Sequence, residues 1–269
     1  MPRILFTDLD GTLLTTDKQI SPGNLSAINE MIEKGHRFVF STGRPLSSVL
    51  KLADAYGFNK PGIFISCYNG GLIYDCGTKK ELLRNPLKKE QARIILDTAH
   101  SLNVHAHTYS DTEVISERDT EELKFYSSRI KVPYIIVPDS IKYLNCNPIK
   151  VIAISRDNLE ILDVLRNKIQ EIFNNTVYTV YSSSVILEFA NPNANKGYGL
   201  IHLCQLLNIP VSDAIAAGDE ENDLTMFEAA GIGVAMKNGK DLIKEAADYV
   251  TQKDNDSDGI AEVIYKFIL

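Results

Sequence analysis

The feature that most constrains the fold of this chain is a pair of carboxylates that directly follows a short apolar segment. Asp8 and Asp10 belong to the sequence DLDGT at residues 8–12, and the apolar residues at 4–6 precede them. A short apolar run bounded by turn residues is typical of a buried strand, so the carboxylates are expected side by side at its end. Like charges at this range repel, and a divalent cation such as Mg²⁺ would offset that repulsion. The alternative is an Asx turn at the surface, and the motif alone favours neither interpretation.

A second segment places a small hydroxyl residue and a glycine where another strand is predicted to pass into a helix. Residues 37–41 predict the strand, Thr42 and Gly43 follow it, and Pro45 opens a helix over 45–56. A hydroxyl group and a backbone N–H at such a turn can bind a phosphate group. Taken singly, Thr42 is more simply explained as a helix N-cap.

A third segment places a lysine in the first turn of a predicted helix. Lys196 precedes leucines at positions 200, 203, 206 and 207, which indicate the helix. A cation in this turn opposes the helix dipole, so Lys196 is expected to serve something other than the helix. The alternative is a solvated surface lysine, which is what most lysines are.

The fourth segment is acidic and follows a predicted strand at residues 214–217. Gly218 is followed by Asp219 and, in the same short stretch, by Asn222 and Asp223. Acidic residues are common in the first turn of a solvated helix. Because this cluster lies at a strand end, as Asp8 does, a metal site shared with Asp8 is the sharper hypothesis.

These four segments, in this order along the chain, resemble the motifs of the haloacid dehalogenase (HAD) superfamily of phosphohydrolases. Within that superfamily the chain is most similar to the Cof-type branch, which carries a type IIB cap. The similarity to this branch rests on residues 42–45 (TGRP), 69–71 (NGG), 195–197 (NKG) and 218–223 (GDEEND). The motifs span Asp8 to Asp223, so the resemblance covers the whole chain, and the joint match is far more specific than any one segment.

Composition and charge limit the kinds of partner and compartment that this protein is expected to have. The net charge of −7 argues against nucleic acid or an anionic membrane as a partner. No apolar run approaches the ~20 residues of a membrane span, and the N-terminus lacks the pattern of a signal peptide. Four scattered cysteines without a CxxC pair suit a reducing compartment, and a disulfide between Cys67 and Cys76 is the less favoured alternative. We therefore expect a cytoplasmic protein that is a monomer or a small homo-oligomer.

The chain divides into two regions of different pattern. In residues 1–84 and 188–269, predicted strands and helices alternate, which indicates an α/β core with a Rossmann-like, doubly wound parallel sheet. The candidate site residues fall at the carboxyl ends of its strands, where open α/β sheets bind ligands. Residues 85–187 are richer in strands and read as a separate, inserted α+β domain. The position and size of this insert match the type IIB cap of the resembled family.

The resemblance implies a role for each site residue. Asp8 would be the nucleophile, and Asp10 would be the general acid and base. Mg²⁺ would be held by the Asp8 carboxylate, the Asp10 backbone carbonyl and Asp219. The phosphoryl oxygens would be bound by Leu9, Thr42, Gly43, Lys196 and Asn222. Asp223 would orient Lys196 or a metal-bound water.

Together these roles imply a Mg²⁺-dependent phosphomonoesterase that acts on a small phosphorylated metabolite. Sugar phosphates are the first expectation, and nucleotide-like, flavin or pyridoxal phosphates remain open. Two further interpretations are a phosphosugar mutase that uses the same aspartyl-phosphate and a non-enzymatic regulator that binds Mg²⁺ and phosphate. Asp10 argues against the regulator, because a pure phosphate acceptor needs no group that protonates a leaving alcohol.

Overall fold

The computed structural model describes residues 2–110 and 112–269 and separates the chain into two compact units. The core unit comprises Met1–Gly43, Val49–Leu83 and Asn195–Leu269, and the inserted unit comprises Arg44–Ser48 and Arg84–Ala194. The chain thus returns to the core unit at 194/195, later than the 187/188 expected from the sequence. The reason is that strand β11 (Ile186–Ala190) pairs along its whole length with β9 of the inserted unit.

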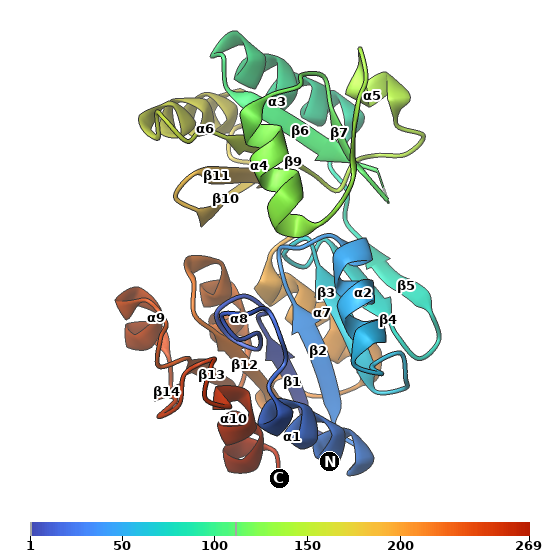
Figure 1. Ribbon diagram of the computed structural model, residues 1–269, viewed down its shortest axis with the longest axis vertical. Coiled ribbons are helices and arrows are strands. Elements are labelled where there is room, and N and C mark those ends of the chain that lie inside the picture. The colour runs from blue at the N-terminus through green and yellow to red at the C-terminus, as the bar shows by residue number, and fades with distance from the viewer. Residues whose placement is uncertain (1, 111) are drawn as a thin grey trace. The chain divides into compact units, whose positions relative to one another are not determined.

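The core unit is built on a sheet of eight strands in the order β14-β13-β12-β1-β2-β3-β4-β5 (Figure 1). Their bounds are β1 Ile4–Thr7, β2 Arg37–Ser41, β3 Ile63–Cys67, β4 Leu72–Asp75, β5 Lys80–Arg84, β12 Ala214–Gly218, β13 Ile232–Ala235 and β14 Tyr249–Val250. From β14 to β3 all neighbours are parallel, as the alternation of strands and helices predicted. The sheet is not parallel throughout, because β4 returns antiparallel to β3 after the tight turn at residues 68–71.

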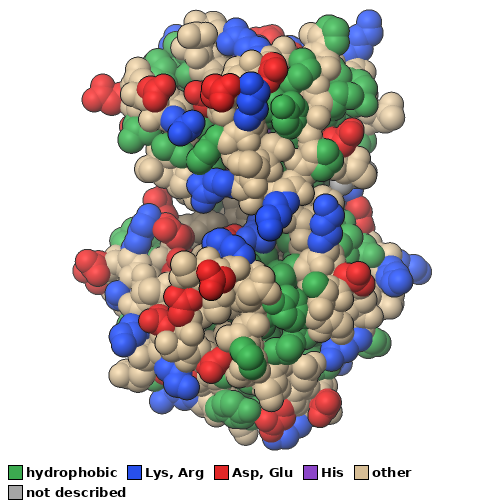
Figure 2. All heavy atoms as spheres, in the orientation of Figure 1, with side chains coloured by type: hydrophobic (Ala, Val, Ile, Leu, Met, Phe, Trp, Pro, Cys, Tyr) green, Lys and Arg blue, Asp and Glu red, His purple; other side chains and the backbone are tan. Residues whose placement is uncertain are grey.

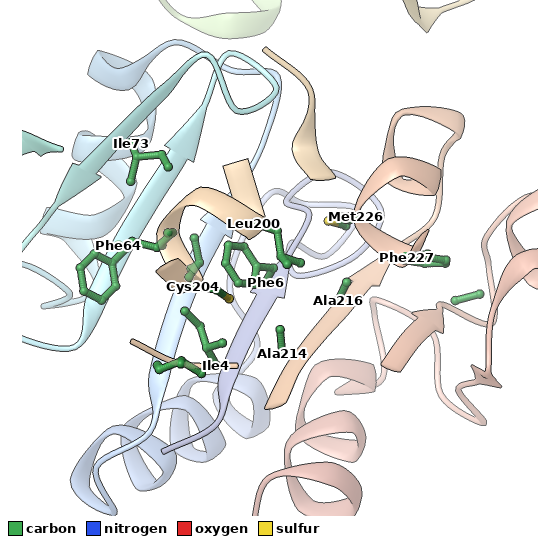
Figure 3. Close-up of a cluster of buried hydrophobic side chains, with 14 of the residues drawn as sticks. Ile4, Phe6, Phe64, Ile73, Leu200, Cys204, Ala214, Ala216, Met226 and Phe227 are labelled. Carbon is green, nitrogen blue, oxygen red and sulfur yellow. The ribbon is translucent and has the colours of Figure 1, made fainter. Parts of the chain in front are cut away.

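Helices cover both faces of this sheet. They are α1 Pro22–Glu33, α2 Leu46–Ala55, α7 Lys196–Leu207, α8 Leu224–Ala229, α9 Asp241–Ala246 and α10 Gly259–Phe267. On one face, Ile4 and Phe6 of β1 pack with Leu200 of α7 and Met226 of α8 in one buried cluster (Figure 3). Helices α1 and α10 pack on each other and on β2 and β12, outside that cluster. Burial on both faces fixes the register of β1 and therefore the point at which Asp8 leaves the sheet.

The inserted unit has its own sheet and its own core. The sheet has six strands in the order β10-β11-β9-β6-β7-β8, and all its pairings are antiparallel except β7 with β8. The strands are β6 His105–Tyr109, β7 Val114–Ser116, β8 Tyr134–Ile136, β9 Lys150–Ile154, β10 Tyr178–Ser183 and β11 Ile186–Ala190, and the helices are α3 Lys89–Ser101, α4 Glu121–Ile130, α5 Ser140–Tyr143 and α6 Glu160–Phe173. Leu96 of α3, Leu165 of α6 and Phe189 of β11 belong to one buried cluster. This is the α+β pattern expected for the insert.

The surface carries charges of both signs. On the face shown in Figure 2, Lys and Arg side chains are interspersed with Asp and Glu side chains over both units. Among residues 2–110 and 112–269, no helix is both long enough and apolar enough to cross a membrane. The four cysteines at positions 67, 76, 146 and 204 are free thiols.

Candidate active site

Three neighbouring parallel strands of the core unit deliver the predicted site residues to one edge of the sheet. Asp8 directly follows β1, Thr42 follows β2 and Asp219 follows β12, and β1 lies between the other two strands. The backbone N–H of Asp8 still donates to the carbonyl of Ala217, at 2.9 Å, so the loop after β1 starts in register with β12. Parallel strands end at the same edge, which is why residues far apart in sequence converge here.

Lys196 lies in the centre of the charged cluster. Its Nζ donates to Asp8 Oδ1 at 2.6 Å and to Asp223 Oδ1 at 2.5 Å, and its side chain is fully buried. Burial by itself would lower the pKa of the lysine, but the charges of Asp223 and Asp8 outweigh burial and raise it. Lys196 is therefore protonated and holds the predicted nucleophile in place. This explains a cation in the first turn of α7, which the helix dipole disfavours.

Asp219 is held by a residue that sequence reasoning did not assign. Thr12 Oγ1 donates to Asp219 Oδ1 at 2.6 Å, and both residues are buried. Gly11 makes this approach possible, because a Cβ at that position would lie 2.4 Å from Asp219 Oδ2. The Gly11 backbone also has a φ of +86°, which a glycine adopts without strain. The Gly-Thr half of the DLDGT motif thus positions a carboxylate more than 200 residues later in the chain.

Asp223 joins Lys196 to the loop that carries Asp219. Its Oδ2 accepts from the backbone N–H groups of Asp219, at 2.9 Å, and Glu220, at 3.0 Å. Its Oδ1 accepts from Lys196. The contact with Lys196 is one of the two alternatives expected for Asp223, the other being a metal-bound water. The bonds to the backbone add a role in shaping the loop.

The carboxylates at this site outnumber the cation that pairs with them. Asp8, Asp219 and Asp223 are buried together, and Lys196 contributes one positive charge. Burial, opposed by Lys196 and reinforced by the charge of Asp223, raises the pKa of Asp8 to about 7. Burial and the charge of Asp8, opposed by the bond from Thr12, raise the pKa of Asp219 to about 8. Carboxyl groups that hold protons this firmly lack compensating positive charge.

The donor set at this excess of negative charge fits Mg²⁺. Asp8 and Asp219 offer buried carboxylate oxygens, and the Asp10 backbone carbonyl was the third predicted ligand. Mg²⁺ prefers oxygen ligands, keeps several waters and is commonly bound by only one or two carboxylates. Within the part of the chain that the structure describes, no group of three or more His, Cys, Asp or Glu side chains could hold a metal ion. The candidate ligands at Asp8, Asp10 and Asp219 are all oxygen atoms, which suit a hard cation such as Mg²⁺.

Asp10, the predicted acid and base, differs from the buried carboxylates because its side chain is 43% exposed. Its Oδ1 accepts a hydrogen bond from Lys18 Nζ at 2.7 Å, a contact that sequence reasoning missed. Leu9, between the two aspartates, is fully buried. Asp8 and Leu9 are thus both buried, whereas Asp10 lies at the accessible side of the site.

The predicted phosphate-binding residues Thr42 and Asn222 are linked by Asn69. The Asn69 backbone N–H donates to the Thr42 carbonyl at 2.9 Å, and Asn69 Oδ1 accepts from Asn222 Nδ2 at 3.1 Å. Sequence reasoning used Asn69 only as a mark of resemblance. The available signal was the Asn-Gly pair after β3, which is typical of a tight turn with positive φ.

The fold and this site define a hydrolase of the HAD type. A family model of haloacid dehalogenase-like hydrolases matches residues 5–264, and the chain belongs to that family. A solved structure of a haloacid dehalogenase-like hydrolase from Bacteroides thetaiotaomicron superposes with a TM-score of 0.89 at 28% identity, covering 99% of each chain. The α/β fold class and the family predicted from the sequence are confirmed.

Two curated relatives that match over nearly the full length of both chains are phosphatases. The protein 5-amino-6-(5-phospho-D-ribitylamino)uracil phosphatase YcsE of Bacillus subtilis is 30% identical over 268 residues, which cover 99% of this chain and 96% of that protein. Pyridoxal phosphate phosphatase YbhA of Escherichia coli is 26% identical over 275 residues, which cover 99% of each. The prediction of a phosphatase enzyme is confirmed, and the regulator without activity is set aside.

Proposed function

We propose that this phosphatase is a Mg²⁺-dependent phosphomonoester hydrolase that acts on a small phosphorylated metabolite through an aspartyl-phosphate at Asp8. The observation that carries the proposal is the buried cluster in which Lys196 bonds Asp8 and Asp223 while Asp219 lies close by. Such a cluster needs a cation, and it holds one carboxylate ready for attack. Asp8, the Asp10 carbonyl and Asp219 would hold Mg²⁺. When bound, Mg²⁺ would supply positive charge to the phosphoryl oxygens.

The two chemical steps use Asp8 and Asp10. An oxygen of the Asp8 carboxylate attacks phosphorus, the phosphorus–ester oxygen bond breaks, and Asp10 gives a proton to the leaving alkoxide. Asp10, now ionised, takes a proton from water, which attacks the phosphorus of the aspartyl-phosphate. The bond between Asp8 and phosphorus breaks, inorganic phosphate leaves and both carboxyl groups return to their starting states.

The remaining residues would bind the three phosphoryl oxygens. Thr42, the backbone N–H groups of Leu9 and Gly43, Lys196 and Asn222 are the proposed donors. Lys196 already contacts Asp8 at 2.6 Å, so the same cation can orient the nucleophile and face an oxygen of the phosphoryl group. Donors fixed before the reaction stabilise the charge that develops in the transition state. Asp223 would keep Lys196 in position.

The inserted unit would act as a type IIB cap that selects the leaving group. It has its own sheet and core, and the residues of the charged cluster all lie in the core unit. A separate unit can therefore vary its contacts without disturbing the chemistry. Sugar phosphates are the proposed substrates. The names of the relatives point to a phospho-D-ribitylamino compound and to pyridoxal phosphate as further members of the class to test.

The proposed setting is the cytoplasm, with a monomer or a small homo-oligomer as the working form. Free thiols at all four cysteines support a reducing compartment. The net charge of −7 supports a small anionic substrate bound by a local site, with neither nucleic acid nor membrane as a partner.

The test is a phosphate-release screen across sugar phosphates, nucleotides, flavin mononucleotide and pyridoxal phosphate, with Mg²⁺ and with excess chelator. The proposal expects inorganic phosphate release that depends on Mg²⁺ for at least one sugar phosphate. Transfer of the phosphoryl group to a second sugar hydroxyl without release would instead identify a mutase. Release that persists unchanged in chelator would contradict the metal-dependent mechanism.

A further inference from the structure

We propose that Asn69 is a positioning residue for phosphate binding, which fixes the side-chain amide of Asn222 so that Nδ2, the donor end, lies on the side of Asn69. The inference rests on the proposed function, in which Asn222 and Thr42 bind the phosphoryl group. It assigns a task to a residue that contributes no group to the chemical steps.

Asn69 contacts two of the phosphate-binding segments at once. It is buried, with 3% of its surface exposed. Its backbone N–H donates to the carbonyl of Thr42 at 2.9 Å, and its Oδ1 accepts from Asn222 Nδ2 at 3.1 Å. The Thr42 N–H in turn donates to the carbonyl of Ser66, at 2.9 Å. Ser66 lies one residue before the end of β3 and three residues before Asn69. Asn69 therefore ties the loop after β2 to the acidic loop after β12.

The backbone around Asn69 is in an uncommon conformation. Tyr68, Asn69 and Gly70 have φ values of +53°, +54° and +86° in succession. Left-handed backbone is unfavourable for tyrosine and is best tolerated by asparagine and glycine. Such runs persist only where the surrounding structure holds them, and they concentrate at functional sites.

The turn also contacts the segment that carries Lys196. A Cβ at Gly70 would lie 2.3 Å from the carbonyl oxygen of Asn195, the residue that caps α7 before Lys196. The turn at 68–70 therefore lies against three of the segments that supply site residues, namely those at Thr42, Asn195 and Asn222. A single turn can thereby set the spacing of phosphate donors that come from different strands.

The amide of Asn222 needs such a partner because its two ends are nearly identical in shape and opposite in polarity. The NH₂ end donates and would stabilise a phosphoryl oxygen, whereas the carbonyl end would present lone pairs to it. An acceptor at Asn69 Oδ1 favours the orientation in which the NH₂ end of Asn222 faces Asn69. Without that acceptor both orientations become accessible, and the wrong one opposes an anionic ligand.

The test combines Asn69→Gly with Asn222→Ala in a double-mutant cycle, using kcat and KM for a substrate found in the screen. Glycine keeps the positive φ at position 69 without strain, so this variant removes the side chain alone. We expect Asn69→Gly to lower kcat/KM by about tenfold to a hundredfold. We expect the double variant to equal Asn222→Ala within about twofold, because Asn69 acts through Asn222.

Two further variants keep the test decisive. Asn69→Asp retains an acceptor and tolerates positive φ, so its kcat should lie closer to wild type than that of Asn69→Gly. Because it adds a negative charge near the phosphate, its KM should rise. This variant decides the question if Asn69→Gly fails to fold. Asn208→Gly is the matched control: Asn208 has a φ of +53°, is exposed and lies at the end of α7, so kcat/KM should be unchanged.

The inference is overturned if Asn69→Gly retains wild-type kcat/KM, if its loss adds in full to that of Asn222→Ala, or if Asn69→Asp has the kcat of Asn69→Gly. Asp8→Asn is measured in parallel to separate this inference from the proposed function. An active Asp8→Asn enzyme would refute the proposed function. An inactive Asp8→Asn enzyme beside a fully active Asn69→Gly enzyme would refute the inference alone.

Discussion

The core unit and the inserted unit each bury a lysine, and the two lysines have different surroundings. In the inserted unit, Lys150 Nζ pairs with Glu188 Oε2 at 2.8 Å, and their side chains are 1% and 5% exposed. In the core unit, Lys196 is shared between Asp8 and Asp223, with Asp219 nearby. The first pair is neutral, whereas the second cluster has more carboxylates than cations.

This difference in charge balance distinguishes a structural ion pair from a candidate active site. A buried pair of opposite charges needs nothing further, although it adds little stability compared with apolar side chains of the same size. A buried excess of carboxylates is unfavourable unless protons or a cation relieve it, and proteins keep such clusters where function requires them. The same chemical change, from carboxylate to amide, should therefore have opposite effects on stability in the two units.

The largest effect is expected from Asp8→Asn, which should lower phosphate release by about a thousandfold or more, because an amide does not attack phosphorus. The thermal unfolding midpoint should stay the same or rise, since the change removes one of the crowded buried carboxylates. Phosphate release and thermal melting measure the two effects. Asp157→Asn, at an exposed loop of the inserted unit, is the matched control. Activity within about tenfold of wild type would remove Asp8 from the role of nucleophile.

The opposite outcome is expected from Glu188→Gln in the inserted unit. This change removes the carboxylate charge that faces buried Lys150 and should cost about 3 kcal/mol or more of unfolding free energy. Denaturant unfolding measures the loss. Replacing both Lys150 and Glu188 by methionine should recover most of it, because no unpaired charge remains. A Glu188→Gln variant as stable as wild type would show that burial and pairing do not distinguish the two lysines.

A smaller and selective effect is expected from Asp10→Asn. Because Asp10 is the proposed general acid and base, its loss should reduce the rate most for substrates whose leaving alcohol needs protonation. The loss of activity on a sugar phosphate should be about tenfold or more greater than the loss on an aryl phosphate, whose leaving group needs little protonation. Steady-state rates on the two substrates provide the comparison. Equal losses on both would mean that Asp10 shapes the metal site and transfers no proton.

Local pattern in the sequence predicted the elements that carry the site. The strands β1 and β2 lie where the apolar residues at 4–6 and the segment 37–41 predicted them, and α2 lies within the helix predicted over 45–56. The strands β4 and β5 were not assigned from the sequence: β4 is only four residues long, and β5 begins with the exposed residues Lys80 and Glu81. β5 lacks the apolar run or clear alternation that identifies a strand.

Contacts between distant segments could not be predicted in the same way. Thr12 lies 207 residues from Asp219, and Asn69 lies 153 residues from Asn222. Those pairs meet only because β1, β2, β3 and β12 are neighbours in one sheet, and strand order is a property of the whole chain. Residue types therefore revealed what chemistry the site performs, while the topology revealed which side chains hold the chemical groups in place.

The central claim is that the excess of buried carboxylates in the core unit is a Mg²⁺ site. The pKa values of Asp8 and Asp219 are raised to about 7 and about 8, from an ordinary value of 3.8. Without metal, the stability that these groups contribute is fully present below about pH 4 and is lost as the pH rises through 7 to 8. Mg²⁺ competes with those protons, so it should stabilise the fold more as the pH rises.

The direct measurement is the thermal unfolding midpoint with and without Mg²⁺ at about 10 mM, a concentration well above the Kd of a weak site. The measurement runs from about pH 5.5 to about pH 8, the range over which the two groups titrate. We expect an increase with Mg²⁺ that grows with pH, by about 2–4 °C for each kcal/mol of binding free energy. The increase should be lost in Asp219→Asn and kept in Asp157→Asn. A Mg²⁺ effect that is absent, independent of pH or unchanged in Asp219→Asn would contradict the claim.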